Sequence, residues 1–210
     1  METTAYLLSQ AAAGDADAQF RVGYRLAFGR RRPRPTDWAA VLRYWEQAAV
    51  QQHRRALFYL GTCYDHGRGV AADVKRAYDY FRQAAAAGSV EAAYNVGFCY
   101  SRGQGVGPDA EEAVAWFRYA AECGDAEAQR ELGYCYMLGK GVEPDYARAV
   151  HWYRKAARQH DRKAQYNLGL CYYSGEGVGY SRQWAAYWWR RAAASGHRRA
   201  KKELRNLMNQ

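Results

Sequence analysis

The chain has 210 residues, of which 49% are hydrophobic and 15% aromatic, a composition that excludes a disordered chain and suits a packed core. No apolar run is long enough for a signal peptide core or a membrane span. The net charge of +10 is uneven: residues 1–55 hold nine basic and five acidic residues, 56–145 eight and thirteen, and 146–210 fourteen and three. These features predict a soluble, cytoplasmic protein with a basic C-terminal third.

A short glycine-containing segment recurs along the chain at a constant interval of 36 residues. In each copy a cysteine follows two residues after the glycine. A period of this length predicts a helical repeat protein, whose units stack on their neighbours into one elongated domain. The phased glycines are Gly61, Gly97, Gly133 and Gly169, and the phased cysteines are Cys63, Cys99, Cys135 and Cys171.

The period divides the chain into five repeats between two half repeats. Each repeat is predicted to contain a helix A, a glycine-rich loop, a helix B and a tight turn. The ends carry one capping helix each, because a terminal repeat needs a polar outer face. The expected single solenoid domain covers residues 1–210, with capping helices at 1–14 and 197–210 and repeats at 15–52, 53–88, 89–124, 125–160 and 161–196.

The repeat at 89–124 illustrates the local signals. Ala92, Val96 and Cys99 follow the spacing of one buried helical stripe. Gly103 is expected to stop helix A, and Asp109 to cap the N-terminus of helix B. Helix B of each repeat then carries an aromatic pair three residues before a double alanine, which predicts large rings packed against small side chains. The phased glycine lies where its missing side chain lets the partner helix approach.

Both terminal repeats depart from this pattern. In the first, a basic run over residues 30–34 replaces the Gly-x-Gly-Val loop, and Arg25 replaces the phased cysteine. In the last, Ser181 replaces the aspartate that precedes helix B, and it can still act as the cap. His160 takes a turn position that glycine holds in the neighbouring repeats.

The five cysteines are predicted to be reduced. Equivalent atoms of stacked helices lie about 10 Å apart, whereas a disulfide needs Cα atoms closer than roughly 7 Å. The four phased cysteines are therefore expected to be small buried hydrophobic residues, and Cys123 has no evident mate.

Taken together these motifs resemble the Sel-one-like repeat (SLR), a relative of the tetratricopeptide repeat. The resemblance lies in Ala-Gln-Tyr-Asn-Leu-Gly at 164–169, in the Gly-x-Gly-Val loops and in Trp-Tyr-Arg-Lys-Ala-Ala at 152–157, and it extends over nearly the entire chain. It implies an all-α, right-handed α/α superhelical solenoid. It also implies a non-enzymatic protein–protein interaction module, of an adaptor, regulatory or immunity type.

By analogy with related repeats, the A helices should line a concave groove that binds a protein or peptide. Rigid aromatic side chains are favoured anchors in such interfaces. The alternative is that these aromatics are buried by packing between neighbouring A helices. The predicted partner-binding residues are Phe20, Tyr24, Phe58, Tyr94, Phe98, Arg130, Tyr134, Met137, Tyr166, Leu170, Tyr173 and Lys202.

The basic C-terminal third forms a second candidate surface. It could steer an acidic protein partner, or bind nucleic acid through phosphates and nearby tryptophans. It could also be a solvated capping surface, and the acidic middle of the chain permits head-to-tail self-association. The predicted basic patch contains Arg154, Lys155, Arg158, Arg162, Lys163, Arg190, Arg191, Arg198 and Arg199.

No motif predicts catalysis or a cofactor. The Gly-x-Gly-Val loops lack the preceding strand and the following Lys-Ser/Thr of a phosphate-binding loop. Cys63 and His66 have no second pair of ligands at a spacing that suits a metal. The histidines are scattered, and no nucleophile has an activating neighbour in sequence. The sequence therefore predicts neither an enzyme nor a metal site.

Overall fold

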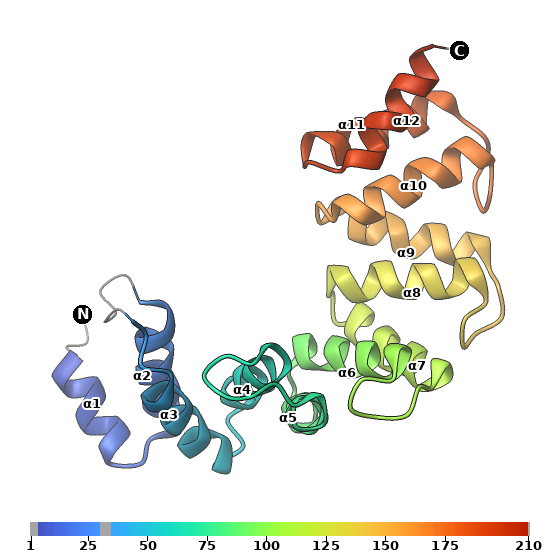
Figure 1. Ribbon diagram of the computed structural model, residues 1–210. Coiled ribbons are helices and arrows are strands. Elements are labelled where there is room, and N and C mark those ends of the chain that lie inside the picture. Colours follow the sequence, from blue (N-terminus) through green and yellow to red (C-terminus); the bar gives the residue numbers. More distant parts are fainter. Residues whose placement is uncertain (1–3, 30–34, 210) are drawn as a thin grey trace. The chain divides into compact units, whose positions relative to one another are not determined.

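The computed structural model describes residues 4–29 and 35–209, and within them the chain forms twelve α-helices and no strand (Figure 1). The predicted all-α repeat architecture is therefore confirmed, and the basic run at 30–34 lies outside the described residues. The helices are α1 Thr4–Ala12, α2 Ala16–Phe28, α3 Trp38–Val50, α4 Arg54–His66, α5 Val74–Ala86, α6 Val90–Arg102, α7 Ala110–Glu122, α8 Ala126–Leu138, α9 Tyr146–Arg158, α10 Arg162–Ser174, α11 Arg182–Ala194 and α12 Arg198–Met208.

These helices group into two compact units, Met1–Pro108 with α1–α6 and Asp109–Gln210 with α7–α12. The even-numbered helices α2 to α10 are the A helices, and the odd-numbered helices α3 to α11 are the B helices. In the first unit α2 packs on α3 and α4 on α5, and in the second α8 packs on α9 and α10 on α11. Figure 1 shows α8 to α11 as antiparallel neighbours, as short connections between helices require.

The start of every helix from α2 to α12 is capped by a side chain that accepts a hydrogen bond from a first-turn backbone N–H. Such a cap stabilises a helix by about 1 kcal/mol. The caps predicted at Asp109 and Ser181 are present, and two of the remaining caps are histidines rather than aspartate or serine. The capping residues are Asp15, Asp37, His53, Asp73, Ser89, Asp109, Asp125, Asp145, Asp161, Ser181 and His197.

The ends of the A helices also follow the sequence signals. Gly103 ends α6 in the left-handed conformation at φ 68°, and its N–H bonds to the carbonyl of Cys99. Gly67, Gly139 and Gly175 end α4, α8 and α10 in the same way. His160 adopts φ 67° at the turn where its neighbours have glycine, as its position in the repeat indicated.

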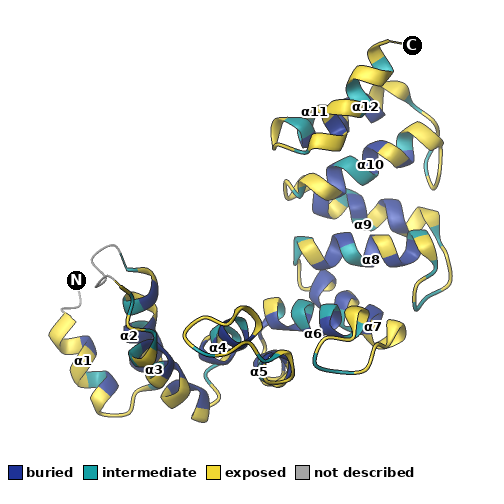
Figure 2. Cartoon of the chain, in the orientation of Figure 1, coloured by how far each residue is buried: buried dark blue, intermediate teal, exposed yellow. Residues whose placement is uncertain are grey.

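Within each unit, phased glycines lie where an A helix crosses the buried aromatic ring of its B helix. A Cβ atom at Gly61 would lie 2.6 Å from the ring of Phe81, and one at Gly133 would lie 2.8 Å from the ring of Tyr153. Gly169 faces Trp189 in the same manner. Figure 2 shows the buried residues on the helix faces that meet within each unit.

Buried glutamines tie A helices to the B helices before them. Nε2 of Gln129 donates to the carbonyl of Ala121 at 3.1 Å, and Nε2 of Gln165 donates to the carbonyl of Ala157 at 3.1 Å. Gln159 then donates to Oε1 of Gln129 at 2.9 Å. Gln19 and Gln51 repeat both bonds in the first unit. Sequence reasoning did not predict these bonds.

Candidate partner-binding groove

The first unit contains a groove of about 530 Å³ on the surface formed by its A helices. Three residues predicted to bind a partner, Phe20, Tyr24 and Phe58, lie together in it. Because side chains four residues apart share one helix face, α2 and α4 each present two successive turns to the groove. The lining residues are Phe20, Arg21, Tyr24 and Arg25 of α2, Arg54, Arg55, Phe58 and Tyr59 of α4, and Gly88, Ser89, Val90 and Glu91 around the start of α6.

The floor of the groove is a packed set of aromatic rings. Phe20 is only 4% exposed, and its ring centroid lies 4.9 Å from that of His53 and 5.8 Å from that of Tyr59. Tyr24 contacts Tyr59 edge-on at 5.7 Å and remains 42% exposed at the rim. Burial, and next the neighbouring Tyr24, raises the pKa of Tyr59 above its ordinary value. This aromatic cluster therefore contains both a ring that is buried by packing, Phe20, and a ring that is accessible to solvent, Tyr24.

The rim of the groove is strongly basic. Arg54 and Arg55 are exposed in the first turn of α4, where the helix macrodipole is already positive. In the described part of the chain, no carboxylate lies within ion-pair distance of Arg25, Arg54 or Arg55. The groove lining thus contains four arginines, Arg21, Arg25, Arg54 and Arg55, and one acidic residue, Glu91.

The remaining aromatic residues predicted to bind a partner lie outside this groove. In α6 of the first unit, Tyr94 and Phe98 are half-buried, and the guanidinium of Arg102 lies over the Phe98 ring at 5.6 Å. In the second unit Tyr134 and Tyr173 are exposed, at 41% and 38%. Leu170 is similarly exposed, Met137 is half-buried and Lys202 is exposed.

Two predicted residues are engaged inside the second unit. Arg130 is only 7% exposed, and its Nη atoms contact Glu131 at 2.6 Å and Asp161 at 3.1 Å. Its guanidinium therefore joins α8 to the start of α10 and does not face solvent. Tyr166 is half-buried, with its ring stacked on that of His197 at 4.5 Å.

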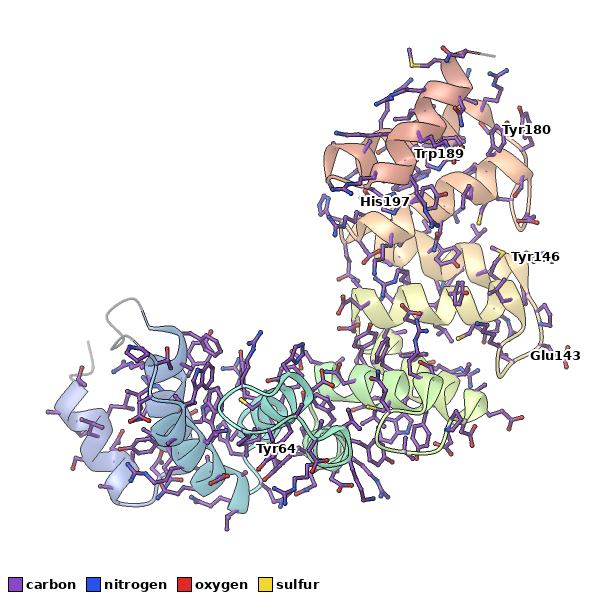
Figure 3. The ribbon with its side chains drawn as sticks, viewed as in Figure 1. Tyr64, Glu143, Tyr146, Tyr180, Trp189 and His197 are labelled. Carbon is purple, nitrogen blue, oxygen red and sulfur yellow. The ribbon has the colours of Figure 1, made fainter. Side chains whose placement is uncertain are left out.

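The predicted basic patch gathers at one edge of the second unit. Its residues lie at the ends of α9 and α11 and the starts of α10 and α12, which the B-to-A turns bring together. In Figure 3 His197 marks this edge, and Glu143, Tyr146 and Tyr180 mark the opposite edge. Arg154 and Arg191 donate to the hydroxyls of Tyr172 and Tyr187. Of the nearby tryptophans, Trp188 and Trp189 are buried and Trp184 is 51% exposed.

Of the groove residues on α2 and α4, sequence reasoning missed five: Arg21, Arg25, Arg54, Arg55 and Tyr59. Two signals point to them. Arg21, Arg25 and Tyr59 each follow a predicted aromatic residue by one position, so they lie about 100° further round the helix and border the predicted face. The Arg-Arg pair immediately follows a helix cap, an unfavourable place for positive charge in a helix.

Residues 4–29 and 35–209 do not provide the features that a metal site or a membrane span requires. No three His, Cys, Asp or Glu side chains gather there closely enough to hold a metal ion. None of the described helices combines the length and the apolar character required to span a bilayer. The second glycine of each Gly-x-Gly-Val loop packs on the first turn of a B helix, as Gly141 does on Ala110, which is a structural reason for glycine there.

Comparison with solved structures places this arrangement among known repeat proteins. The chain is 35% identical to a protective antigen of uropathogenic Escherichia coli that displays an SLR fold, with a TM-score of 0.90 over 96% of this chain and 43% of that one. It thus spans less than half of that protein's length. It is also 35% identical to a Sel1 repeat protein from Oxalobacter formigenes, with a TM-score of 0.84 over 92% of this chain and 78% of that one.

More distant structures share the fold. An immunity protein from Pseudomonas aeruginosa is 22% identical, with a TM-score of 0.54 over 88% of this chain and 66% of that one. No curated protein sequence matches the chain. The Sel1 repeat model matches residues 16–53, 54–89, 90–125, 126–161 and 162–197, one residue later than the repeat starts predicted from the period. The chain therefore belongs to the Sel1 repeat family.

Proposed function

We propose that the chain is a protein-interaction module that holds an extended segment of a partner protein in the groove of its first unit. The groove carries this proposal, because its aromatic floor and basic rim are formed by successive A helices. Sel1 repeat proteins are generally non-enzymatic scaffolds that bind protein partners, and this family role supports the proposal. Depending on its partner, such a module would act as an adaptor, a regulator or an immunity-type inhibitor.

The packing of the groove favours binding without a large rearrangement. Phe20 and Tyr59 are held by neighbouring rings, so little side-chain entropy remains to be lost on binding. Tyr24 and Phe58 keep accessible surface beside them and can contact an apolar side chain of the partner. A preformed site of this kind lowers the free-energy cost of association.

Site-specific photo-crosslinking would test this placement. A benzophenone amino acid in place of Tyr24, which is 42% exposed in the groove, would be compared with one in place of Tyr119, which is 44% exposed on α7. The two positions are matched in residue type and exposure. We expect a discrete crosslinked protein from a lysate of the native host with the probe at position 24 and not at position 119.

The adduct at position 24 should also weaken when Phe58→Ala is introduced, because that change removes part of the groove wall. Circular dichroism would verify that the variant remains helical. Equal crosslinking at positions 24 and 119, or an adduct unaffected by Phe58→Ala, would contradict the proposed groove.

A further inference from the structure

We propose that the groove of the first unit selects an acidic peptide: an extended segment with several Asp or Glu side chains and at least one apolar side chain. This inference rests on the proposed function and adds the chemistry of the partner. It depends on residues outside the predicted partner-binding set, chiefly Arg25, Arg54 and Arg55.

The first argument is the charge of the lining. Four arginines and one glutamate give the groove a net charge of +3, and Glu91 already accepts a hydrogen bond from Ser89 Oγ at 3.1 Å. Arg21 has an exposed partner in Asp17, at 3.7 Å. Arg25, Arg54 and Arg55 extend from two helices toward one groove, so carboxylates entering it would meet forked donors from both sides.

The second argument is the position of the arginine pair. Arg54 and Arg55 occupy the first turn of α4, which contains no acidic residue, whereas α6 carries Glu91 and α8 carries Glu127 at the same place. Positive charge at a helix N-terminus opposes the macrodipole and destabilises the helix. A bound carboxylate would compensate both the arginines and the dipole, so the arrangement suits an anionic ligand.

The third argument separates a peptide from a nucleic acid. Tyr24 and Tyr59 contact each other edge-on at 75°, and Phe20 stacks on His53 at 24° and is almost fully covered. The most buried ring, Phe20, offers no face on which a base could stack, whereas the accessible surface of Tyr24 and Phe58 can receive an apolar side chain. Helix axes pack about 10 Å apart, so about six extended residues at about 3.3 Å each would cross from α2 to α6.

Fluorescence anisotropy with two dye-labelled peptide pools would test the inference. One pool of twelve-residue peptides alternates Asp or Glu with Leu, Phe or Tyr, and the other replaces Asp and Glu by Asn and Gln. We expect the full-length protein to bind the acidic pool at least tenfold more tightly than the amide pool. Its affinity should fall as salt is raised from 50 to 300 mM, because the rim charges are exposed to solvent.

The structure offers a matched control for the arginine pair. His-Arg-Arg-Ala occurs at 53–56 and again at 197–200, and in both copies the histidine caps a helix whose first two residues are the arginines. We expect Arg54→Gln/Arg55→Gln to weaken binding of the acidic pool at least tenfold. Arg198 and Arg199 belong to the predicted basic patch, so Arg198→Gln/Arg199→Gln removes the same charge from the other candidate surface and should weaken binding much less than the groove variant does.

The possible outcomes distinguish this inference from the proposed function. If both pools bind equally and Phe58→Ala abolishes that binding, the acidic selectivity is overturned, whereas the proposed peptide-binding groove is supported. Binding of neither pool would overturn both. An equal loss of affinity in the two arginine double variants would assign the effect to general charge. Displacement of the acidic pool by a mixed-sequence single-stranded DNA of twelve nucleotides, at equal concentration, would overturn the inference in favour of nucleic acid.

Discussion

Gln165 is almost fully buried, yet no donor among the described residues reaches its Oε1 atom. In the preceding repeat, Nε2 of Gln159 donates to Oε1 of Gln129 and to the carbonyl of Gly124, both at 2.9 Å. The residue 36 positions after Gln159 is Ser195, which is too short to reach the equivalent acceptors. An unsatisfied buried acceptor costs about 1 to 3 kcal/mol.

Ser195→Gln should therefore stabilise the protein, by about 1 kcal/mol, by supplying the missing donor. The two positions share a backbone conformation, with φ −83° and ψ 15° at Gln159 and φ −83° and ψ 14° at Ser195, so the new side chain can follow the same path. Urea unfolding would measure the change, and Gln159→Ser should produce a loss of similar size. Two variants that shift stability in the same direction would contradict this explanation.

Glycine inside a helix normally destabilises it, and replacing it by alanine gains about 1 kcal/mol. At Gly61 we expect the opposite, because the added Cβ would lie 2.6 Å from the ring of Phe81. Overpacking a core costs about 1 to 3 kcal/mol, which outweighs the gain in helix propensity. Gly61→Ala should thus lower the free energy of unfolding.

The double variant Gly61→Ala/Phe81→Leu provides the control for Gly61→Ala. In the presence of Phe81→Leu, the alanine substitution should cost less than it does beside phenylalanine, because the smaller side chain leaves space for the methyl group. Additive effects in the double-mutant cycle would show that the ring is not the cause.

At the scale of the helix, the histidine cap of α12 makes the start of that helix sensitive to pH. Nδ1 of His197 accepts the N–H of Ala200 at 3.2 Å, which requires that this nitrogen carry no proton. Burial lowers the pKa of His197 below its ordinary 6.5, and the positive charges of Arg162, Arg199 and Lys163 lower it further. The folded state therefore favours the neutral ring.

The sign of the pH dependence follows from that lowered pKa. Below pH 6.5 the unfolded chain binds a proton at His197 before the folded chain does, so stability is lost as pH falls from about 6.5 towards the lowered folded pKa. His197→Asn keeps a good cap without a titrating group. It should flatten the difference in melting temperature between pH 7.5 and 5.5, whereas an unchanged difference would exclude His197 as its source.

Over the whole molecule, the five cysteines differ in their access to solvent. Cys123 is exposed, whereas the four phased cysteines are buried. Burial raises the pKa of Cys63, Cys99 and Cys135 to about 11 and that of Cys171 to about 12. Only thiolates react with alkylating or disulfide reagents, so the phased thiols are protected both by packing and by their protonation.

A thiol reagent at pH 8 should label one cysteine rapidly in the native protein and all five in denaturant. Mass spectrometry would identify Cys123 as the labelled site, and Cys123→Ser should abolish the fast phase. Rapid native labelling of any phased cysteine would mean that its unit opens without global unfolding.

The elements of this protein could be predicted from its sequence because their causes are local. A helix cap or a helix stop acts within a few residues, as Asp109, Ser181 and Gly103 do, and these signals determine the helix boundaries. The 36-residue period then repeats them along the chain. The crossing of phased glycines and buried rings within each unit also follows, since both residue types recur at fixed positions of the period.

The candidate site could be predicted only in part, because it depends on contacts between elements. Spacing grouped Phe20, Tyr24 and Phe58, but it treated Arg130 as their equivalent, and only the packing of α8 against Asp161, 31 residues away, buries that arginine. The groove itself forms only when α2, α4 and the start of α6 are stacked, which brings the arginine side chains of α2 and α4 together. A periodic sequence determines which residues share a helix face, whereas the tertiary structure decides which of those faces remain open to solvent.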